Sequence, residues 1–505
     1  MNNRITSWLE REKKIVEEQG GFRPERSTAE QIFILKEMIQ GRRRGKKKTY
    51  CCFLDIRKAY DTVFREGLWM QVVGKGIEGK MWRVIKNLYR EVGSCVRLGE
   101  EKTDWFEIEV GLRQGCILSP ILFSIFIDGL AEEVKKIGGA KYGKVVVSLL
   151  LFADDIVLMA ENARMLQEML DVVYKYSKKY RFCFNKEKSN VMVFGMRKKC
   201  QDKFRLGEND LKIVETYKYL GLILDKNFSW KKHLEKVLEK ARKRSRALCG
   251  LGIRKGTSAR AILRGWEVLV RPVLEYGAEI WGEKKWKEGE MLQMEMGRRV
   301  LGISKMTTKQ VIQGELGLKR ISSRRVILRL RFWSKIITIK DKTRLVYQIY
   351  KKRRENFIKE KKKDKNNWCY WTWKSLQDLQ LEYIWESENL EILGKKNFDQ
   401  IVKIAVEKKE EEEWIEQMKK KPKLRLYRKL KNKLSCENYI IKFERGRRKQ
   451  LTRIRSGTNH LRIERGRWVG ERVEERVCNV CLCNEVEDVE ETLSTKMFNV
   501  CRRES

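Results

Sequence analysis

Apolar residues fall in short runs along residues 49–225, and the clearest of these runs flank an acidic pair. Residues 145–162, VVVSLLLFADDIVLMAEN, contain two apolar runs rich in branched side chains, with Asp154 and Asp155 between them. Such runs predict two strands, and their short separation predicts a tight hairpin. Aspartates at a hairpin turn have two interpretations, a solvated turn or a metal platform.

A third carboxylate follows another apolar run. Residues 49–63, TYCCFLDIRKAYDTV, begin as a strand that ends at Asp55. A carboxylate at the end of a buried strand can lie beside a neighbouring hairpin, and three such oxygen donors suit two Mg²⁺ ions about 4 Å apart. The third acid therefore favours the metal platform, whose chemistry is phosphoryl transfer.

Apolar residues at helical spacing lie between these strands. Ser27 and Glu30 form a capping box at the start of one such stripe, and further stripes occur in residues 62–92 and 166–173. The order strand, helices, hairpin, helix, strand predicts an α+β fold, with an antiparallel sheet backed by helices on one face.

A glycine-bounded turn precedes another predicted helix. Gly111 and Gly115 flank Arg113 and Gln114, and a turn of this kind lets the backbone approach a ligand closely. Ser119 then caps a helix with proline at its first position. The alternative is an ordinary junction between a loop and a helix.

The charge of the chain narrows the class of partner. Its 505 residues include 112 Lys and Arg against 69 Asp and Glu, a formal net charge of +43. Such a field holds polyanions and releases them as salt rises, so we expect nucleic acid as the partner. No apolar stretch approaches the length that spans a bilayer, and we expect no membrane insertion.

Histidine and cysteine usage narrows the chemistry. Because the chain has only two histidines, His233 and His460, histidine metal clusters and Ser-His-Asp catalysis are almost excluded. This again favours carboxylates as the catalytic groups. The first residues lack the apolar core of a secretory signal, so we expect an intracellular chain whose 13 cysteines are reduced.

Two later segments have more than one interpretation. The basic loop at residues 41–48, GRRRGKKK, is either a solvated charge run or a phosphate contact. Residues 340–450 are dense in charge, and the aromatic cluster WCYWTW at 368–373 within them is expected to pack in a core rather than stack on bases.

Taken in order, six blocks resemble the reverse transcriptase of a non-LTR (LINE-type) retrotransposon. The resemblance covers about residues 20–225 and implies a right-hand polymerase whose palm holds Asp55, Asp154 and Asp155 as its metal-binding catalytic triad. The six blocks are GGFRPERST, FLDIRKAYD, GLRQGCILSPILF, LFADDIVLM, FNKEKSNVM and YKYLGLILD.

The resemblance implies substrate roles at single positions. Tyr60 matches the aromatic residue that excludes a nucleotide 2′-hydroxyl, and Gln114, between Arg113 and Gly115, matches a residue that shapes the nucleotide pocket. Lys188 matches a lysine near the incoming triphosphate. The structural alternatives are a core tyrosine, a turn residue and a solvated surface charge.

The resemblance also implies a division of the chain and a set of partners. The partners are an RNA template, a DNA primer or target, and dNTPs, in the nucleus and in cytoplasmic ribonucleoprotein. The expected regions are partial fingers at 1–50, a palm with the catalytic motifs at 51–210, a primer grip and helical thumb at 211–305, a basic, mainly helical connector at 306–470 and a degenerate Cys-rich knuckle at 471–505.

The last of these regions departs from the family. Cys478 and Cys481 have the spacing of a zinc clip, but the expected histidine is missing, so we do not expect Zn²⁺ to bind. The chain also begins after the start of the family's fingers and contains no endonuclease, which indicates an N-terminally truncated open reading frame.

Two functions from different classes remain. The first is an RNA-directed DNA polymerase that uses two Mg²⁺ ions, with Mn²⁺ as the alternative ion, to transfer a nucleotide from a dNTP to a primer 3′-hydroxyl. The second is a catalytically inactive relic of a retroelement that binds RNA or DNA.

Overall fold

The computed structural model describes residues 1–195, 200–254, 257–283, 286–361, 363–388, 390, 394–458, 466, 469–477 and 486, and of residues 251–254 only the backbone. The chain forms two compact units. Unit 1 comprises Met1–Leu234, Phe332–Leu376 and Trp385–Glu388, and unit 2 comprises Glu235–Arg331, Gln377–Ile384 and Asn389–Ser505.

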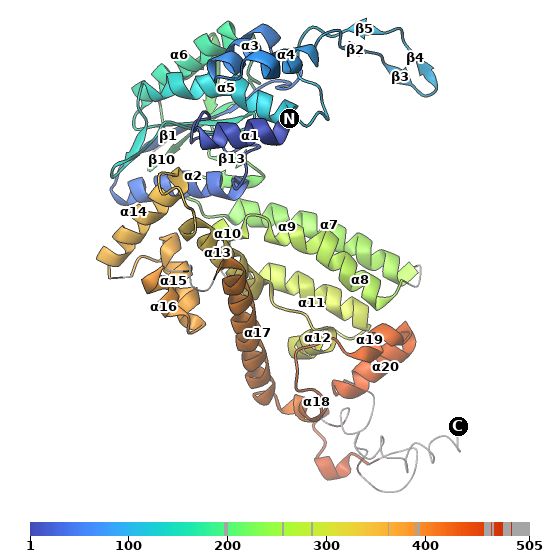
Figure 1. The fold of residues 1–505 in the computed structure, drawn as a ribbon. Helices are drawn as coiled ribbons and strands as arrows, with labels where there is room; N and C mark the ends of the chain where they lie inside the picture. The colour runs from blue at the N-terminus through green and yellow to red at the C-terminus, as the bar shows by residue number, and fades with distance from the viewer. Residues whose placement is uncertain are drawn as a thin grey trace. The chain divides into compact units, whose positions relative to one another are not determined.

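Unit 1 is built on a six-stranded sheet (Figure 1). Its strands, in spatial order, are β11 (Phe204–Leu206), β12 (Asn209–Ile213), β10 (Asn190–Phe194), β1 (Thr49–Asp55), β9 (Asp155–Ala160) and β8 (Leu149–Phe152). β1 pairs antiparallel with both β9 and β10, and its first six residues are buried, as expected for an interior strand. β10 and β12 pair in parallel, so the sheet is mixed and not fully antiparallel as predicted.

Different elements cover the two faces of this sheet. Tyr50, Cys52 and Leu54 alternate along β1 and belong to the apolar core formed with helices α5 (Ser119–Lys135) and α6 (Ala163–Lys179). Phe53 points the other way and stacks on Tyr217, with ring centroids 4.4 Å apart. Tyr217 belongs to a hairpin of β13 (Thr216–Tyr219) and β14 (Leu222–Asp225).

Helix α2 (Thr28–Arg44) lies on the opposite side of the sheet from α5 (Figure 1). At its start the Ser27 side chain accepts a hydrogen bond from the Glu30 amide, which is one half of the predicted capping box, whereas the Glu30 carboxylate pairs with Lys335 and Arg344 and does not form the other half. The predicted α+β class is thus confirmed, and α2 adds a helix on the face that the sequence analysis left without one.

A later segment of the chain packs on α2. The last six residues of α13 (Ile321–Ile337), all of α14 (Leu345–Lys359) and most of α15 (Trp368–Asp378) belong to unit 1. The ring of Phe33 on α2 lies 5.5 Å from that of Phe332 and 5.1 Å from that of Trp368. Trp368 and Cys369 are buried, which confirms the expected core packing at the start of the aromatic cluster.

Residues of this segment also form ion pairs with buried carboxylates of α2. Glu30 pairs with Lys335 at 2.6 Å and Arg344 at 2.5 Å, and Glu37 pairs with Arg353 at 2.6 Å. The sequence analysis placed this segment in the connector at 306–470, whereas the structure groups residues 332–376 with residues 1–234. The five predicted regions otherwise stay a prediction.

The remaining elements of unit 1 include a long arm (Figure 1). β2 (Gly93–Ser94) pairs with β5 (Phe106–Glu107), and β3 (Arg97–Leu98) pairs with β4 (Glu101–Lys102) at its tip. The other helices of unit 1 are α1 (Asn2–Arg11), α3 (Arg65–Gly74) and α4 (Gly79–Asn87), and the remaining two-stranded sheet pairs β6 (Ala140–Tyr142) with β7 (Val145–Val147).

Unit 2 is helical in its described part. A small core includes Val311, Trp414 and Tyr427, and the Trp414 indole donates to the Gln310 carbonyl at 2.9 Å. Its elements include most of α7 (Lys231–Arg254) together with α8 (Ala259–Gly265), η1 (Trp266–Val270), α9 (Arg271–Glu275), α10 (Ala278–Trp281), α11 (Lys287–Leu301), α12 (Lys309–Leu316), part of α16 (Glu382–Ser387), α17 (Lys395–Lys419), η2 (Pro422–Leu424), α18 (Arg425–Leu430), α19 (Asn438–Lys442), α20 (Arg445–Arg455) and η3 (Val473–Glu475).

Two sequence predictions concern membranes and the tail. Among the helices that the structure describes, none is both long and apolar enough to cross a bilayer. Cys478 and Cys481 lie outside the described residues.

Candidate active site

The structure brings the three predicted carboxylates to one end of two neighbouring strands. In the pairing of β1 with β9, Asp55 lies directly opposite Asp155. Asp154 precedes Asp155 in the turn that joins β8 to β9, where Phe152 pairs with Asp155 across two turn residues. Positions 55, 154 and 155 therefore form one acidic cluster, although about 100 residues of chain separate the first from the other two.

The turn between β8 and β9 is held from one side by residues 18–21. Ala153 has a φ of 57°, a left-handed conformation that costs a non-glycine residue free energy. The Gln19 side-chain oxygen accepts hydrogen bonds from the Ala153 amide at 3.3 Å and the Gly21 amide at 2.8 Å. A Cβ on Gly21 would lie 2.3 Å from the Ala153 nitrogen, so only glycine fits there.

Residues 18–20 also extend the sheet past β8. The Gly20 amide donates to the Leu151 carbonyl at 2.8 Å, and the Leu151 amide donates to the Glu18 carbonyl at 3.0 Å. These bonds satisfy backbone groups of an edge strand. The glycine pair in GGFRPERST thus supports the turn that presents Asp154.

The acidic cluster concentrates like charges in a half-buried site. Burial, followed by the negative charges of Asp154 and Asp55, raises the pKa of Asp155 to about 6. Burial, together with the charge of Asp55, also raises the pKa of Asp154. The positive charges of Lys188 and Lys218 offset part of this increase in the pKa of Asp155. Ionised carboxylates here repel one another, and a divalent cation would relieve that repulsion.

The donor set here fits divalent cations, since carboxylate oxygens are hard ligands. Within the described residues, no three side chains of His, Cys, Asp or Glu already surround a point suited to a metal ion. The fit therefore rests on the strand register and on the clustered charge of Asp55, Asp154 and Asp155.

Lys188 lies beside Asp55. Its Nζ is 3.4 Å from the Asp55 Oδ2, and its side chain is 65% exposed. The segment that carries it is fixed by the backbone, because the Asn185 amide donates to the Asp55 carbonyl at 2.8 Å and the Tyr217 hydroxyl donates to the Lys188 carbonyl at 2.9 Å. The ammonium group is thus anchored at its base and open to solvent at its tip.

Tyr60 lies next to the acidic cluster. Its ring stacks on Phe123, with centroids 5.2 Å apart and planes at 12°, and it makes an edge contact with Phe22 at 6.5 Å. Burial, followed by the charge of Asp154, raises the pKa of Tyr60 to about 12. The ring is therefore held rigidly close to the carboxylates.

The predicted turn at residues 111–115 is bonded to the chain that follows Tyr60. The Leu112 amide donates to the Tyr60 carbonyl at 2.7 Å, and the Gln114 side chain donates to the Asp61 carboxylate at 2.7 Å. Gly115 has a φ of 81° and open space around it. Arg113 instead donates to the Leu88 carbonyl at 3.2 Å, at the end of α4.

The sequence analysis gave no role to several residues at this site. Lys218 and Tyr217 lie in the block YKYLGLILD, and both interact electrostatically with Asp155. The alternation of side chains along this strand could have predicted that one of the two faces the acidic pair. Gln19 and Asp61 support the site through contacts with Ala153 and Gln114, which are distant in the sequence and which no local pattern predicts.

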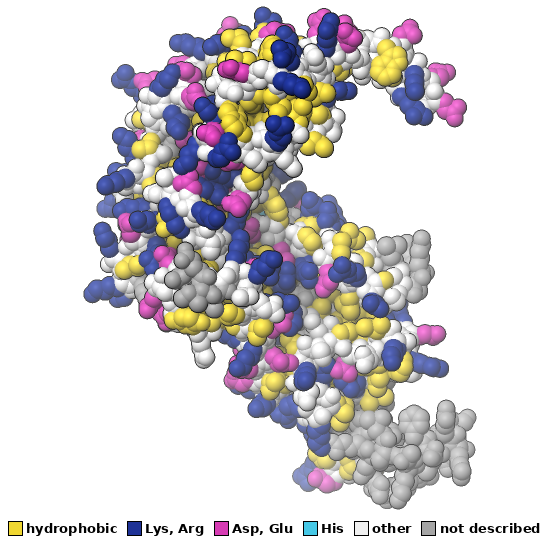
Figure 2. All heavy atoms as spheres, viewed as in Figure 1, with side chains coloured by type: hydrophobic (Ala, Val, Ile, Leu, Met, Phe, Trp, Pro, Cys, Tyr) yellow, Lys and Arg dark blue, Asp and Glu magenta, His cyan; other side chains and the backbone are white. Residues whose placement is uncertain are grey.

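Basic side chains are spread widely over the face shown in Figure 2, on both units, and do not gather in one patch. Residues 41–44 of the predicted basic loop at 41–48 instead form the end of helix α2. Arg42 is buried and bonds to Thr49 and to Glu161, which also pairs with it at 2.6 Å. Arg42 is therefore neither a solvated charge nor a phosphate contact.

Comparisons with known proteins found relatives over part of the chain. Residues 1–224 match the family described as reverse transcriptase (RNA-dependent DNA polymerase). The chain is 25% identical over 333 residues to the RNA-directed DNA polymerase from mobile element jockey of Drosophila funebris, covering 64% of this chain and 36% of that protein. It is 24% identical over 329 residues to the probable RNA-directed DNA polymerase from transposon X-element of Drosophila melanogaster, covering 63% and 35%.

The chain thus spans about a third of the length of these curated relatives. Among solved structures, apo telomerase from Candida tropicalis is 12% identical, with 69% of this chain and 60% of that chain covered at a TM-score of 0.34. A score this low does not establish a common fold.

Proposed function

Residues 1–224 form a reverse transcriptase domain whose homologues are RNA-directed DNA polymerases of Drosophila non-LTR retrotransposons, and we propose from this premise that the chain copies RNA into DNA. The observation that carries the proposal is the register of β1 and β9, which puts Asp55 opposite Asp155 and beside Asp154. The proposal covers the activity, the substrates and the partners of this chain.

In this proposal the three aspartates hold divalent cations. Mg²⁺ is the proposed ion and Mn²⁺ the alternative, because both accept carboxylate oxygens. When bound, the cations lower the pKa of a primer 3′-hydroxyl and neutralise charge on the phosphates of a dNTP. The hydroxyl then attacks the α-phosphate, and pyrophosphate leaves.

The other residues of the site position the nucleotide. The rigid ring of Tyr60 bars a ribose 2′-hydroxyl, and Gln114, tied to Asp61, shapes the pocket beside it. The exposed ammonium of Lys188 lies near the carboxylates, where it balances the charge of a triphosphate or protonates the leaving pyrophosphate.

The proposed partners are an RNA template and a DNA primer or target. The formal charge of +43 gives the chain a strong field for such polyanions. The exposed Arg242 and Lys243 lie on α7, whose Ala241 and Ser245 are buried, so that one side of this helix packs while the other is free for a phosphate backbone. By resemblance to the family, we place the chain in the nucleus and in cytoplasmic ribonucleoprotein.

Primer extension tests the proposal. Purified protein is given an RNA template, an annealed DNA primer and dNTPs, with Mg²⁺ or Mn²⁺ or with EDTA. Wild-type protein should extend the primer only with metal, and the Asp154→Asn/Asp155→Asn variant should lose at least about 10³-fold in rate, because charge stabilisation at the reacting phosphate is lost. The exposed Asp210 offers a control, since Asp210→Asn should keep full activity.

The second candidate, an inactive nucleic-acid-binding relic, has a distinct outcome in the same experiment. Binding of the RNA template, measured by fluorescence anisotropy, would then be equal in wild type and double variant, and neither would extend the primer. That result would reject the polymerase proposal.

A further inference from the structure

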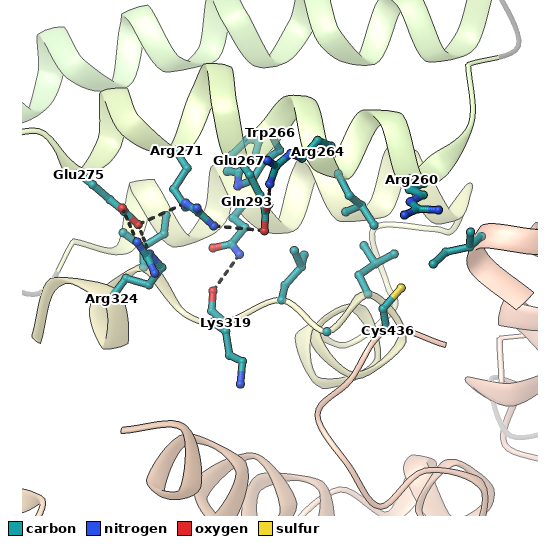
Figure 3. Close-up of a pocket in the computed structure, with 16 residues that line it drawn as sticks. Arg260, Arg264, Trp266, Glu267, Arg271, Glu275, Gln293, Lys319, Arg324 and Cys436 are labelled. Atoms are coloured by element: carbon teal, nitrogen blue, oxygen red, sulfur yellow. Dashed lines mark hydrogen bonds and ion pairs between the residues drawn. The ribbon is translucent and has the colours of Figure 1, made fainter. Parts of the chain in front are cut away.

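A pocket of about 660 Å³ lies within unit 2, apart from the acidic cluster of unit 1. One wall is the continuous run of α8, η1 and α9, and the facing side is the link between α12 and α13 together with residues 436–441 (Figure 3). Its volume is in the range of sites that take small molecules or single building blocks of polymers. The η1 segment is a π-helical turn, a feature that is frequent at functional sites.

Four arginines and two glutamates line this pocket. Glu267 pairs with Arg264 at 3.2 Å and with Arg271 at 3.3 Å. Glu275 pairs with Arg271 at 3.9 Å and with Arg324 at 2.7 Å. Figure 3 shows the resulting row, in which carboxylates alternate with guanidinium groups. Because each carboxylate holds two arginines, the donors are ordered before any ligand arrives.

The row retains positive charge. Three of the arginines share two carboxylates, and the exposed Arg260 has no ion pair or hydrogen bond within the described part of the chain. Figure 3 shows Arg260 at one end of the pocket and the Lys319 ammonium directed away from the row. Lys319 pairs with Glu407 at 3.6 Å instead. The pocket therefore presents two excess positive charges, which match one phosphate group.

The rest of the lining is apolar. The Gln293 side chain donates to the Lys319 carbonyl at 2.9 Å, so this amide is directed at the protein. Cys436 closes one end, next to Leu316, with which it forms an isolated β-bridge. The apolar residues of the lining are Leu263, Trp266, Leu316, Leu318, Ile321 and Ile441.

We propose that this pocket binds one nucleotide, with the phosphate at Arg260 and Arg264 and the base on the apolar lining. Guanidinium groups bind phosphate oxygens in pairs, and a base contributes a flat apolar surface of suitable size. The nucleotide is either free or an unpaired residue of a bound strand. This site goes beyond the proposed polymerase function, which uses the acidic cluster of unit 1.

Protection of Cys436 tests the site without polymerisation. The full-length protein is alkylated slowly with iodoacetamide, and the modification of Cys436 is followed by mass spectrometry. Burial raises the pKa of this thiol, so the reaction is run at mildly alkaline pH. AMP should slow the alkylation of Cys436, whereas inorganic phosphate at the same concentration should have little effect.

Two double variants locate the binding. Arg260→Ala/Arg264→Ala should raise the AMP concentration for half-maximal protection at least fivefold, while Glu267 keeps Arg271 as its partner. The control Arg164→Ala/Arg205→Ala removes the same charge from exposed positions of unit 1 and should leave that concentration unchanged. Equal losses in both variants would overturn the proposal, as would equal protection by phosphate and AMP.

The source of the nucleotide is tested with oligonucleotides. Protection by an oligothymidylate 12-mer that exceeds protection by an abasic 12-mer supports an unpaired residue of a strand. Protection by AMP but by neither oligomer supports a free nucleotide. Absence of protection by AMP and by both oligomers would overturn the proposal.

Discussion

Tyr60 is a single residue that should decide which sugar the site accepts. Its ring is fixed between Phe123 and Phe22, close to Asp154. Removing the ring in Tyr60→Val opens space for a 2′-hydroxyl, so the preference for dGTP over GTP should fall by roughly 10- to 100-fold. The ratio of the two kcat/KM values in primer extension measures this preference.

The matched control is Tyr60→Phe, which keeps the ring and removes only the hydroxyl. It should retain the wild-type ratio, because the bulk of the ring excludes the ribose. Equal ratios in the valine variant and the wild type would show that Tyr60 is only a core residue.

His233 makes the fold sensitive to acid. It is 2% exposed, its Nδ1 accepts a hydrogen bond from the Ile223 amide at 3.3 Å, and burial lowers its pKa to about 4. The unfolded chain, with a pKa near 6.5, then binds a proton that the folded chain does not between about pH 6.5 and pH 4. Stability is therefore lost as pH falls through this window, by roughly 2 kcal/mol between pH 7 and pH 5.

Replacing His233 with glutamine tests this dependence, because glutamine keeps an acceptor for the Ile223 amide and does not titrate. In thermal unfolding followed by circular dichroism, the variant should lose less stability than the wild type between pH 7 and pH 5. Parallel pH profiles for the two proteins would contradict the assignment.

At the residue scale, the sequence located the acidic cluster but not its supports. Asp55 and the acidic pair were predictable because apolar runs end or turn at them. Gln19, which bonds to the turn at Ala153, was not predictable, because its role depends on a contact 134 positions along the chain.

Among the elements, α2 depends on charges supplied by α13 and α14. Glu37 is fully buried, and Arg353, which bonds to it at 2.6 Å, is 2% exposed. Arg353→Met should destabilise the protein by about 3 kcal/mol, because the fully buried carboxylate loses its main partner. Urea unfolding gives this difference.

A second substitution should restore part of the loss. In Glu37→Gln/Arg353→Met the carboxylate is removed together with its arginine partner, whereas Lys36, whose Nζ lies 3.6 Å from the Glu37 carboxylate, loses that ion pair. Additive losses in the double variant would contradict an ion pair as the source of the coupling.

Element prediction succeeded where periodicity is local. The hairpin of β8 and β9 and the helix α6 follow from runs with periods of two and 3.6 residues. The sequence pattern did not predict the central position of β1 or the parallel pairing of β10 with β12, because apolar strands of similar composition can pair in several orders. The charge-dense composition of residues 340–360 likewise hid the packing of α14 on α2.

At the scale of the whole molecule, unit 1 is assembled from separate stretches of chain. A fragment of residues 1–234 lacks the cations that match Glu30 and Glu37 and the aromatic rings that contact Phe33. It should be less stable and more prone to aggregate than the same fragment joined by a flexible linker to residues 332–388.

Thermal unfolding and sedimentation of the two fragments measure this difference. The linked fragment should unfold cooperatively, since it contains all of unit 1. Equal melting temperatures and equal solubility would mean that residues 332–376 contribute little to unit 1.

The central place of β1 also has a consequence for synthesis on the ribosome. β1 pairs with β9 and β10, whose residues emerge about 100 and 140 positions later, and the cations for α2 come later still. At roughly 5–20 residues per second, about 5–24 s pass between the synthesis of residue 234 and that of residues 335–353. During that interval an apolar layer is unfinished, and chaperones have their best opportunity to bind it.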